Sequence, residues 1–290
     1  MPVAERRIRK HNERDMANKG NDVNGSARIR SEVLVIGSGI GGCTTALYLA
    51  GQGCEVTLVC SGRNLDDSNT SLAQGGIVYQ GREDSQDLLR RDILTAGWNQ
   101  NYRRAVQFLS KQGPEAVRQI LVDWLRVPFE REEDGSFKLT REGGHNLNRI
   151  LFCADYTGRA IMDRLKQAVI KSENINLLTQ RTAVDLLTTH HHSQRLEYKY
   201  QLLNQCVGAY LFNQHTGQVE VALADYTVLA SGGVGQVYLH TTNTPDSIGS
   251  GLTMAQRSGA KVMNCEYVQF HPTALFQRGG QQFLITEAIR

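Results

Sequence analysis

A glycine-rich turn between two apolar segments constrains the fold of this chain more than any other feature. The apolar run 33–36 leads into the turn, the amphipathic stretch 43–50 follows it, and a second apolar run covers 56–59. The turn places Gly37, Gly39 and Gly42 in the pattern G-x-G-x-x-G. A strand, a glycine turn, a helix and a second strand in close succession form the setting in which this pattern binds a dinucleotide. We therefore predict a dinucleotide-binding unit.

Each glycine of the turn has a physical role in such a unit. Gly37 allows the tight turn, Gly39 lets a pyrophosphate approach the backbone, and Gly42 lets the helix pack closely on the strand. The phosphates are expected on free N–H groups at the helix N-terminus, where the helix dipole favours negative charge. The second strand runs into 60–62 with no carboxylate before Asp66. Because NAD-binding units usually hold the ribose with an acid there, this argues against NAD.

Two further segments are candidates for lining a cofactor. Residues 69–76 are small, polar and end in two glycines, so they offer backbone and hydroxyl donors. Residues 228–233 end an apolar run in Ala-Ser-Gly-Gly. The first segment is either a cofactor contact or an ordinary loop, and the second is either a close approach to a cofactor or a helix-packing turn. Composition does not separate these alternatives.

The bulk composition limits the class of protein. A chain of 290 residues predicts one large or two modest domains, and 40% hydrophobic with 21% charged residues is typical of a globular protein. A net charge of +3 is too small to indicate nucleic acid or a membrane as a partner. Residues 1–30 hold eight Lys/Arg against four acids and few apolar residues, so we predict a disordered basic tail. Met16 is an alternative start.

Targeting signals and cysteine usage favour a cytoplasmic protein. The tail lacks the apolar core of a secretory signal, and its acids are untypical of a transit peptide. No run of about 18 apolar residues predicts a membrane span. The cysteines form no C-x-x-C pair and are expected to be reduced and mostly buried. They are Cys43, Cys54, Cys60, Cys153, Cys206 and Cys265.

Apolar periodicity predicts the remaining elements of an α/β domain with a parallel sheet and a small antiparallel insertion. Helices are expected over 84–97, 102–125 and 159–171, the second broken at Gly113 and Pro114, and a charged, turn-rich excursion over 131–144. Strand material is expected over 177–187 with a turn near Arg181, a hairpin over 207–212 and 219–223, and a separate buried strand over 226–230.

Two groups of histidines are candidates for functional side chains. His190, His191 and His192 are adjacent, so in a strand they point to opposite faces, and no cysteine or carboxylate constellation accompanies them. We interpret them as a solvated loop tip and predict no metal site. His271 precedes Pro272 and is either a packed turn residue or an imidazole presented to a pocket.

Five motifs in order give the chain a resemblance to a known family. They are 37–42, 69–76, 140–145, 155–159 and 269–275. From about residue 31 to 290 the chain resembles the flavoprotein group of succinate dehydrogenases, fumarate reductases and L-aspartate oxidases. The resemblance implies a Rossmann-like FAD-binding domain over 31–270. It also implies the start of a capping or substrate domain over 271–290.

Two features make the chain most similar to the L-aspartate oxidases of that group. The respiratory members carry a flavin-linked histidine in the stretch that is 70–73 here, and its absence implies non-covalent FAD. Glu142 stands where those members carry an uncharged residue, and its carboxylate would favour an α-ammonium group. The resemblance implies oxidation of L-aspartate to iminoaspartate, the first step of NAD biosynthesis. Hydride passes from Cα to flavin N5, with reoxidation by O2 or fumarate. The oligomeric state is left open.

The resemblance also implies site residues. On the substrate side they are Glu142, His271, Thr286 and Glu287. On the cofactor side they are Gly37, Ser38, Gly39, Ile40, Gly41, Gly42, Ser61, Asn69, Thr70, Ser71, Leu72, Ala73, Gln74, Gly75, Gly76, Val184 and Ser250. Of these, 37–42 would hold the FAD pyrophosphate, 69–76 would lie on the flavin side, and Val184 would contact the adenine region through its backbone.

The chain departs from the family pattern in two places. Ser250 stands between glycines where the family has Asp, which removes a charged hydrogen-bond acceptor near the cofactor. The family also continues beyond Arg290 to the arginine that moves the proton and to a second substrate histidine and arginine. We expect a truncated form. The alternatives are a non-catalytic remnant, one piece of a split flavoprotein, or an NAD-linked dehydrogenase, which the absent strand-end carboxylate disfavours.

Overall fold

The computed structural model describes residues 28–190, 195–271, 273–275 and 283–285. Two residues predicted on the substrate side, Thr286 and Glu287, lie outside these ranges, as do His191 and His192. Within the described residues no helix is long and apolar enough to cross a membrane.

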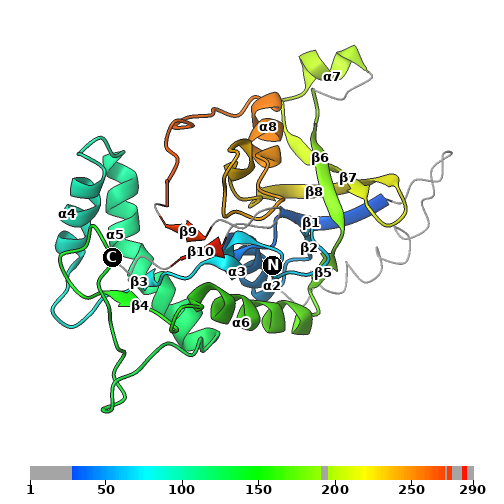
Figure 1. The fold of residues 1–290 in the computed structure, drawn as a ribbon. Helices are drawn as coiled ribbons and strands as arrows, with labels where there is room; N and C mark the ends of the chain where they lie inside the picture. The colour runs from blue at the N-terminus through cyan, green and yellow to red at the C-terminus, as the bar shows by residue number, and fades with distance from the viewer. Residues whose placement is uncertain (1–27, 191–194, 272, 276–282, 286–290) are drawn as a thin grey trace.

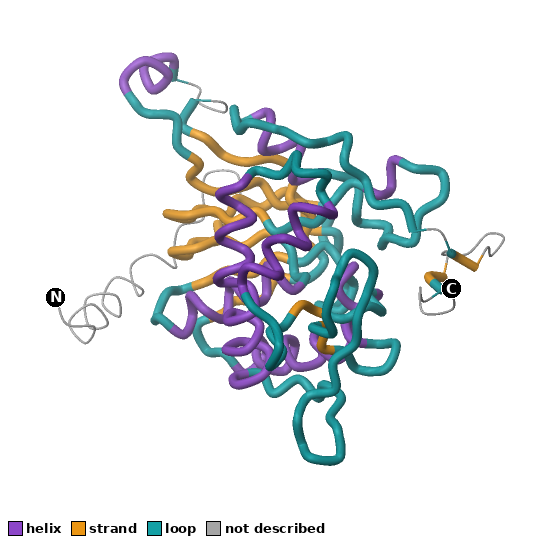
Figure 2. The backbone as a smooth tube through the Cα atoms, turned by 90° about the vertical axis from the view of Figure 1, so that its left-hand side faces the viewer, coloured by secondary structure: helices purple, strands orange, loops and turns teal. Residues whose placement is uncertain are grey.

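A six-stranded sheet forms the centre of the molecule, in the order β5-β2-β1-β8-β7-β6 (Figures 1 and 2). Its strands are β1 (Arg28–Ile36), β2 (Val56–Val59), β5 (Ile175–Leu178), β6 (Arg181–Thr188), β7 (Cys206–Asn213) and β8 (Gln218–Leu229). Strands β5, β2, β1 and β8 are parallel, whereas β8, β7 and β6 are antiparallel. The predicted α/β class, with a parallel sheet and an antiparallel insertion, is confirmed.

Alternating side chains of β1 divide the core into two layers. Val33 and Val35 pack on the side of α2 (Ile40–Gly51) and α6 (Thr157–Lys171). Leu34 and Ile36 pack on the opposite side, in the cluster that contains Met254 of α8 (Ser250–Arg257). Figure 1 shows α2 and α6 on one side of the sheet and α8 on the other. Because successive strand residues point to opposite faces, the unbroken apolar run 33–36 requires burial of both faces.

The remaining elements are shorter or lie beside the sheet. The helices are α3 (Asn69–Leu72), α4 (Gln86–Ala96), α5 (Arg103–Val117), the π-helix η1 (Arg118–Trp124), α7 (Leu196–Gln201) and the 3₁₀ helix η2 (Gly235–Val237). Two small antiparallel sheets pair β3 (Ile77–Val78) with β4 (Ile150–Leu151), and β9 (Ala274–Leu275) with β10 (Phe283–Leu284).

The predicted break at Gly113 and Pro114 is wrong. Helix α5 continues to Val117 with Pro114 inside it. Val106, Ser110 and Pro114 are its buried positions, four residues apart, so they form one packed face. A proline removes a single backbone donor, and burial of this face keeps the helix continuous.

Strand pairing also corrects two of the predicted boundaries. Strand β1 begins at Arg28, inside the segment predicted as a disordered tail, because Arg28 and Arg30 pair with Val221 and Leu223 of β8. The hairpin strand 219–223 and the separate strand 226–230 are one element, β8. Its second half is not buried, since Tyr226 is 71% exposed.

Candidate functional site

A cleft of about 250 Å³ lies at the carboxyl ends of β1, β2 and β8 and the start of β6. Of the predicted cofactor residues, nine line it: Gly37, Ser38, Gly39, Ile40, Gly41, Ser61, Asn69, Thr70 and Ser250. Ligands of open α/β sheets bind outside the carboxyl ends of the strands. The cleft therefore occupies the position where this type of sheet holds its ligand.

The N-terminus of α2 provides an anion-binding surface in this cleft. Gly39 caps the helix without a side-chain hydrogen bond, and the first turn contains no acid. Within the described part of the chain, the N–H groups of Gly41 and Gly42 have no acceptor, whereas Ile40 N–H donates to Thr70 Oγ1 at 3.1 Å. Free N–H groups at a helix N-terminus favour a phosphate or carboxylate.

The glycines of the turn are required by close backbone contacts. Gly37 has φ +113°, and a Cβ there would lie 2.2 Å from the carbonyl oxygen of Ala230. A Cβ on Gly42 would lie 1.8 Å from the carbonyl oxygen of Gly37. Ala230 N–H in turn donates to Ile36 O at 2.8 Å. The turn is thus packed against the end of β8, which brings Ala230, and the Ser231 and Gly232 that follow, into the cleft lining.

The start of the segment 69–76, which begins as helix α3, lines the cleft through Asn69 and Thr70. Asn69 Nδ2 donates to Ser247 Oγ at 2.7 Å, and Asn69 Oδ1 accepts from Thr244 N–H at 2.8 Å. Both partners belong to the loop after β8 and line the cleft. The hydroxyl of Ser68, also in the lining, is buried without a partner in the described structure. A buried polar group without a partner indicates a ligand or water that completes the site.

The same segment contacts both regions predicted to hold substrate. Gly76 N–H donates to Glu142 Oε1 at 2.9 Å. Gln74 Nε2 donates to Leu284 O, in β10, at 2.8 Å. The hairpin of β9 and β10 also includes the bond from Ile285 N–H to Thr273 O at 3.2 Å, two residues after His271. Residues distant in sequence thus meet at 74–76.

His271 is half-buried within its own turn. Its Nδ1 lies 2.9 Å from Thr273 O, and the N–H of Thr273 points back to the same nitrogen at 3.4 Å. The ring is therefore oriented by its local backbone. His190, at the predicted loop tip, has its Nε2 2.6 Å from Leu202 O. In the described ranges, no three His, Cys, Asp or Glu side chains form a group that could hold a metal ion.

Several predicted cofactor residues are not part of the cleft lining. These are Gly42, Ser71, Leu72, Ala73, Gln74, Gly75, Gly76 and Val184. Val184 is 48% exposed, and its neighbour Ala183 lines the cleft instead. The pairing of β6 with β7 is irregular between Ala183 and Asp185, so Val184 lies at a break in the strand register. The carbonyl of Val184 accepts a hydrogen bond from Arg257 Nη2 at 3.2 Å.

Sequence reasoning missed the part of the lining that comes from the loop after β8. Thr244, Asp246 and Ser247 line the cleft. They belong to a stretch of Thr, Asn, Pro, Asp and Ser that is typical of turns, so no pattern distinguished them. Contacts of this loop with Asn69 and Ser61, both distant in sequence, bring these residues to the site.

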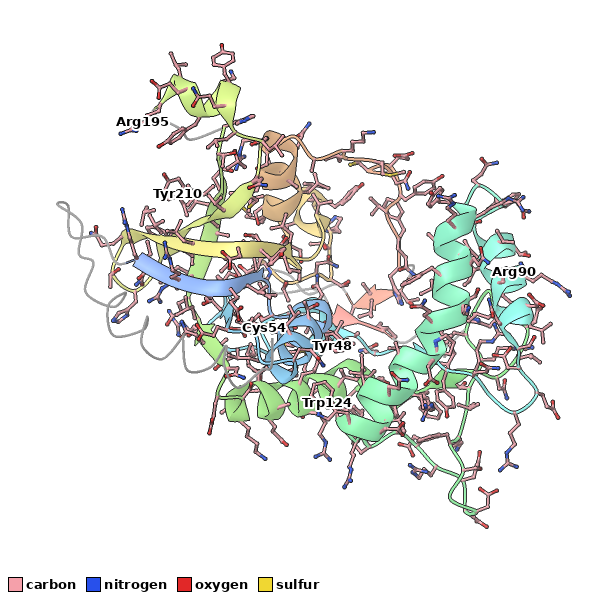
Figure 3. All side chains as sticks on the ribbon, turned by 180° about the vertical axis from the view of Figure 1, so that it is seen from behind. Tyr48, Cys54, Arg90, Trp124, Arg195 and Tyr210 are labelled. Carbon is pink, nitrogen blue, oxygen red and sulfur yellow. The ribbon has the colours of Figure 1, made fainter. Side chains whose placement is uncertain are left out.

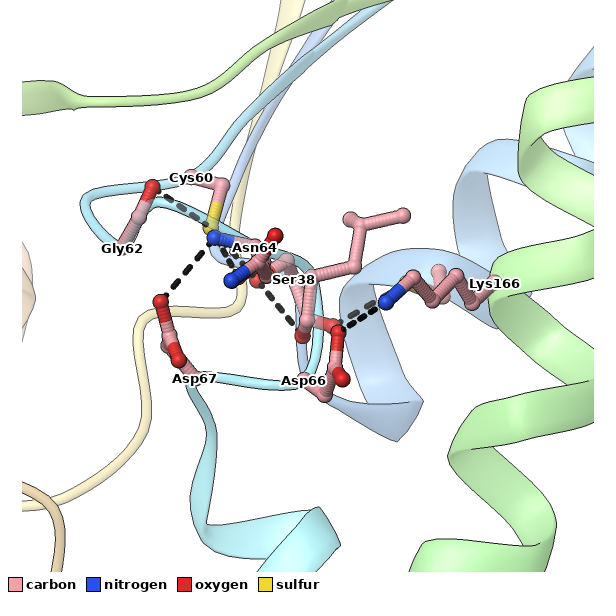
Figure 4. A network of polar contacts seen from close by, with 9 residues as sticks. Ser38, Cys60, Gly62, Asn64, Asp66, Asp67 and Lys166 are labelled. Carbon is pink, nitrogen blue, oxygen red and sulfur yellow. Dashed lines mark hydrogen bonds and ion pairs between the residues drawn. The ribbon is translucent and has the colours of Figure 1, made fainter.

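A polar network supports the cleft from behind (Figure 4). Ser38 Oγ donates to Cys60 Sγ at 3.1 Å, and Cys43 Sγ donates to Ser38 O at 3.0 Å. Burial raises the pKa of Cys60, and burial raises the pKa of Cys43 to about 12. Both thiols are therefore neutral near pH 7, and a neutral thiol is a poor nucleophile.

Asp66, the first acid after β2, is directed away from the cleft. Its Oδ1 accepts from Lys166 Nζ at 2.7 Å, and this hydrogen bond lowers the pKa of Asp66 (Figure 4). Lys166 belongs to α6, on the helical layer behind the sheet. The acid nearest to β2 in sequence is therefore engaged with a helix rather than with the cleft.

The parallel sheet, the glycine turn and the anion-binding helix end define a dinucleotide-binding domain. The sequence profile described as the FAD binding domain matches residues 32–290. The chain therefore belongs to the FAD-binding domain family, and FAD is its cofactor. The free N–H groups at α2 and the unpartnered hydroxyl of Ser68 fit such a ligand.

Named relatives match most of this chain but only part of their own length. L-aspartate oxidase of Pseudomonas aeruginosa is 39% identical over 91% of this chain and 49% of the relative. L-aspartate oxidase of Vibrio cholerae is 38% identical over 92% of this chain and 49% of the relative. The chloroplastic L-aspartate oxidase of Arabidopsis thaliana is 37% identical over 88% of this chain and 39% of the relative. The chain spans about half the length of the bacterial relatives that it matches.

Solved structures show the same fold. The Sdh1 complex of Mycobacterium smegmatis in its apo form is 25% identical, with a TM-score of 0.75, over 85% of this chain and 42% of that chain. The open conformation of a flavocytochrome c3 fumarate reductase is 23% identical, with a TM-score of 0.75, over 97% of this chain and 48% of that chain. At this identity the second likeness concerns the fold alone.

Proposed function

We propose that this chain is the FAD-binding portion of an oxidoreductase that converts L-aspartate to iminoaspartate, with O2 or fumarate as the final acceptor. Family membership and the relatives named L-aspartate oxidase support the proposal. The observation that carries it is the double contact of the segment 69–76. The segment bonds to Glu142 on one side and to β10 on the other. The segment that starts at the cofactor cleft with Asn69 and Thr70 is thereby joined to both regions assigned to the substrate.

On the cofactor side, the chain's own groups bind and orient FAD. The N–H group of Gly41, in the cleft lining, holds the pyrophosphate, and Gly37 allows the backbone turn beneath it. Residues 31–270 form the cofactor domain, and 271–290 begin the substrate domain. Attachment is non-covalent, because 70–73 contain no histidine. Bound FAD supplies the hydride acceptor, and the protein supplies position and electrostatics.

On the substrate side, we assign Glu142 to the ammonium group. Its Oε1 accepts the Gly76 N–H, and in the described structure its Oε2 accepts no hydrogen bond. Because Oε1 is held by the Gly76 N–H, Oε2 is the oxygen of this exposed carboxylate that is left to accept a hydrogen bond from a cationic group. His271 is assigned to a substrate carboxylate. Thr286 and Glu287 are assigned to the same side from the family resemblance.

Anaerobic flavin reduction tests this assignment without depending on the final acceptor. The 290-residue chain is incubated with FAD and desalted, and L-aspartate or succinate is added while the flavin absorption band is followed. We expect retained, dissociable flavin that L-aspartate bleaches. Glu142→Gln should lower the preference for aspartate over succinate by about 10-fold, the magnitude of one charge-assisted hydrogen bond.

Glu133→Gln is the matched control, because Glu133 is an exposed acid of the excursion 131–144 without a described partner. It should leave both flavin retention and selectivity unchanged. Retained flavin that aspartate does not reduce would contradict the proposed reaction for this chain. Unchanged selectivity in Glu142→Gln would remove Glu142 from the substrate site.

A further inference from the structure

The end of β2 lacks the acid that its own sequence would supply. In dinucleotide-binding folds, a carboxylate near this position accepts hydrogen bonds from the ribose hydroxyls. Asp66 is engaged with Lys166. Asp67 lines the cleft, but its Oδ2 accepts the N–H of Asn64 at 3.0 Å and so stabilises the turn. Asp66 is therefore not available as the ribose acceptor at β2. Within the described residues Asp67 keeps Oδ1 free, but its contact is with Asn64 inside the turn rather than with the residues that directly follow the strand.

A different loop brings a carboxylate to this place. Asp246 lines the cleft, and its Oδ2 accepts a hydrogen bond from Ser61 Oγ at 3.0 Å. Ser61 lies two residues beyond Val59, the last residue of β2. The two residues are 185 positions apart in sequence. Asp246 therefore stands beside the end of β2, although it follows β8.

The loop that carries Asp246 is fixed on both sides. Ser247 is buried, accepts from Asn69 Nδ2, and its carbonyl oxygen accepts from Gln236 N–H at 3.0 Å. Ser247 N–H donates to Thr244 O at 3.0 Å. These bonds hold the backbone next to Asp246 while its side chain stays exposed. The backbone thus positions the carboxylate, while among the described residues one of its oxygens remains free to accept a hydrogen bond from a ligand.

We propose that Asp246 binds the adenosine ribose hydroxyls of the cofactor. In the described part of the chain, its Oδ1 accepts no hydrogen bond, and the residue forms no ion pair. A carboxylate without a cationic partner repels phosphate. In a cleft that binds a diphosphate, it is therefore expected to contact a neutral part of the ligand that donates hydrogen bonds. Ribose hydroxyls meet this requirement, and Ser61 completes the pair of polar groups. The inference rests on FAD binding and not on the identity of the oxidised substrate.

Nucleotide fragments test this ribose site separately from flavin chemistry. Titration calorimetry on the 290-residue chain compares ADP with 2′-deoxy-ADP. The wild-type chain should prefer ADP by about 10-fold, as expected for one hydrogen bond to a charged group. Asp246→Ala should lose that preference by weakening ADP about 10-fold while 2′-deoxy-ADP changes little.

Two further variants keep the outcome interpretable. Asp225→Ala removes an exposed acid of β8 outside the cleft and should retain the wild-type preference. Asp246→Asn keeps the shape of the side chain but removes its charge, and it should also reduce the preference for ADP. Equal loss of both nucleotides in Asp246→Ala with an unchanged urea midpoint, or no ADP binding by the wild type, would overturn the ribose assignment.

The ribose assignment and the proposed reaction can fail separately. Intact ADP preference with no reduction of bound flavin by aspartate would support Asp246 and contradict the proposed reaction. Aspartate oxidation with no preference for ADP over 2′-deoxy-ADP would support the proposed reaction and contradict the ribose assignment of Asp246.

Discussion

Replacement of Arg149 by Met is expected to destabilise the fold more than any surface substitution. The guanidinium is fully buried, with Nη2 3.0 Å from Asp84 Oδ1 and Nη1 3.1 Å from Asp92 Oδ2, and both carboxylates are 2% exposed. The N–H groups do not point along hydrogen bonds, so the attraction is mainly between charges. Removal of the arginine leaves two carboxylates buried without a cation.

The expected loss is about 3–5 kcal/mol in the free energy of unfolding, the magnitude found when one partner of a buried ion pair is removed. Urea denaturation followed by circular dichroism measures it. The matched control is Arg90→Met, whose side chain points outward from α4 (Figure 3). Its pair with Asp87, at 3.1 Å, is 49% and 76% exposed, so about 0–1 kcal/mol is expected.

A third variant distinguishes the effect of the two unpaired carboxylates on the free energy of unfolding from the effect of lost side-chain packing. Arg149→Met combined with Asp84→Asn and Asp92→Asn removes all three charges and should recover part of the lost stability. The reasoning is refuted if Arg149→Met costs no more than Arg90→Met. It is also refuted if the triple variant is no more stable than the single one, because stranded buried charges would then not be the cause.

Two more predictions concern the glycine turn and its thiol. Gly42→Ala should abolish FAD retention after desalting, because its Cβ would lie 1.8 Å from the carbonyl of Gly37. Gly51→Ala, at the other end of α2 and with nothing within 4 Å of its Cβ, should retain FAD, and equal retention by the two variants would contradict this account. Burial holds the pKa of Cys43 at about 12 against an ordinary value of 9.0, so above pH 9 the unfolded chain releases a proton that the fold keeps. The free energy of unfolding should therefore fall from about pH 9 to 12, and Cys43→Ala should reduce this slope in urea midpoints measured at several pH values. An unchanged slope would exclude Cys43 as a source.

The local elements of the nucleotide-binding unit could be predicted from the sequence. The apolar run 33–36 and the glycines at 37, 39 and 42 specify a buried strand and a tight turn through their own side chains or lack of them. Their burial and close contacts in the structure follow the same reasoning. Helix α5 is a harder case, because Pro114 predicts a break that only the packed face of that helix prevents.

The walls of the cleft and the contact of Glu142 could not be predicted in the same way. Asp246 meets Ser61 across 185 positions, and Glu142 meets Gly76 across 66. Local patterns carry no information on such pairs, since each partner has the composition of an ordinary loop. The sequence by itself determined the turn, the buried strands and the glycines that a phosphate needs. The tertiary structure alone decided that Asp246 stands beside the end of β2, because the sheet order β2-β1-β8 brings together loops that the chain keeps far apart.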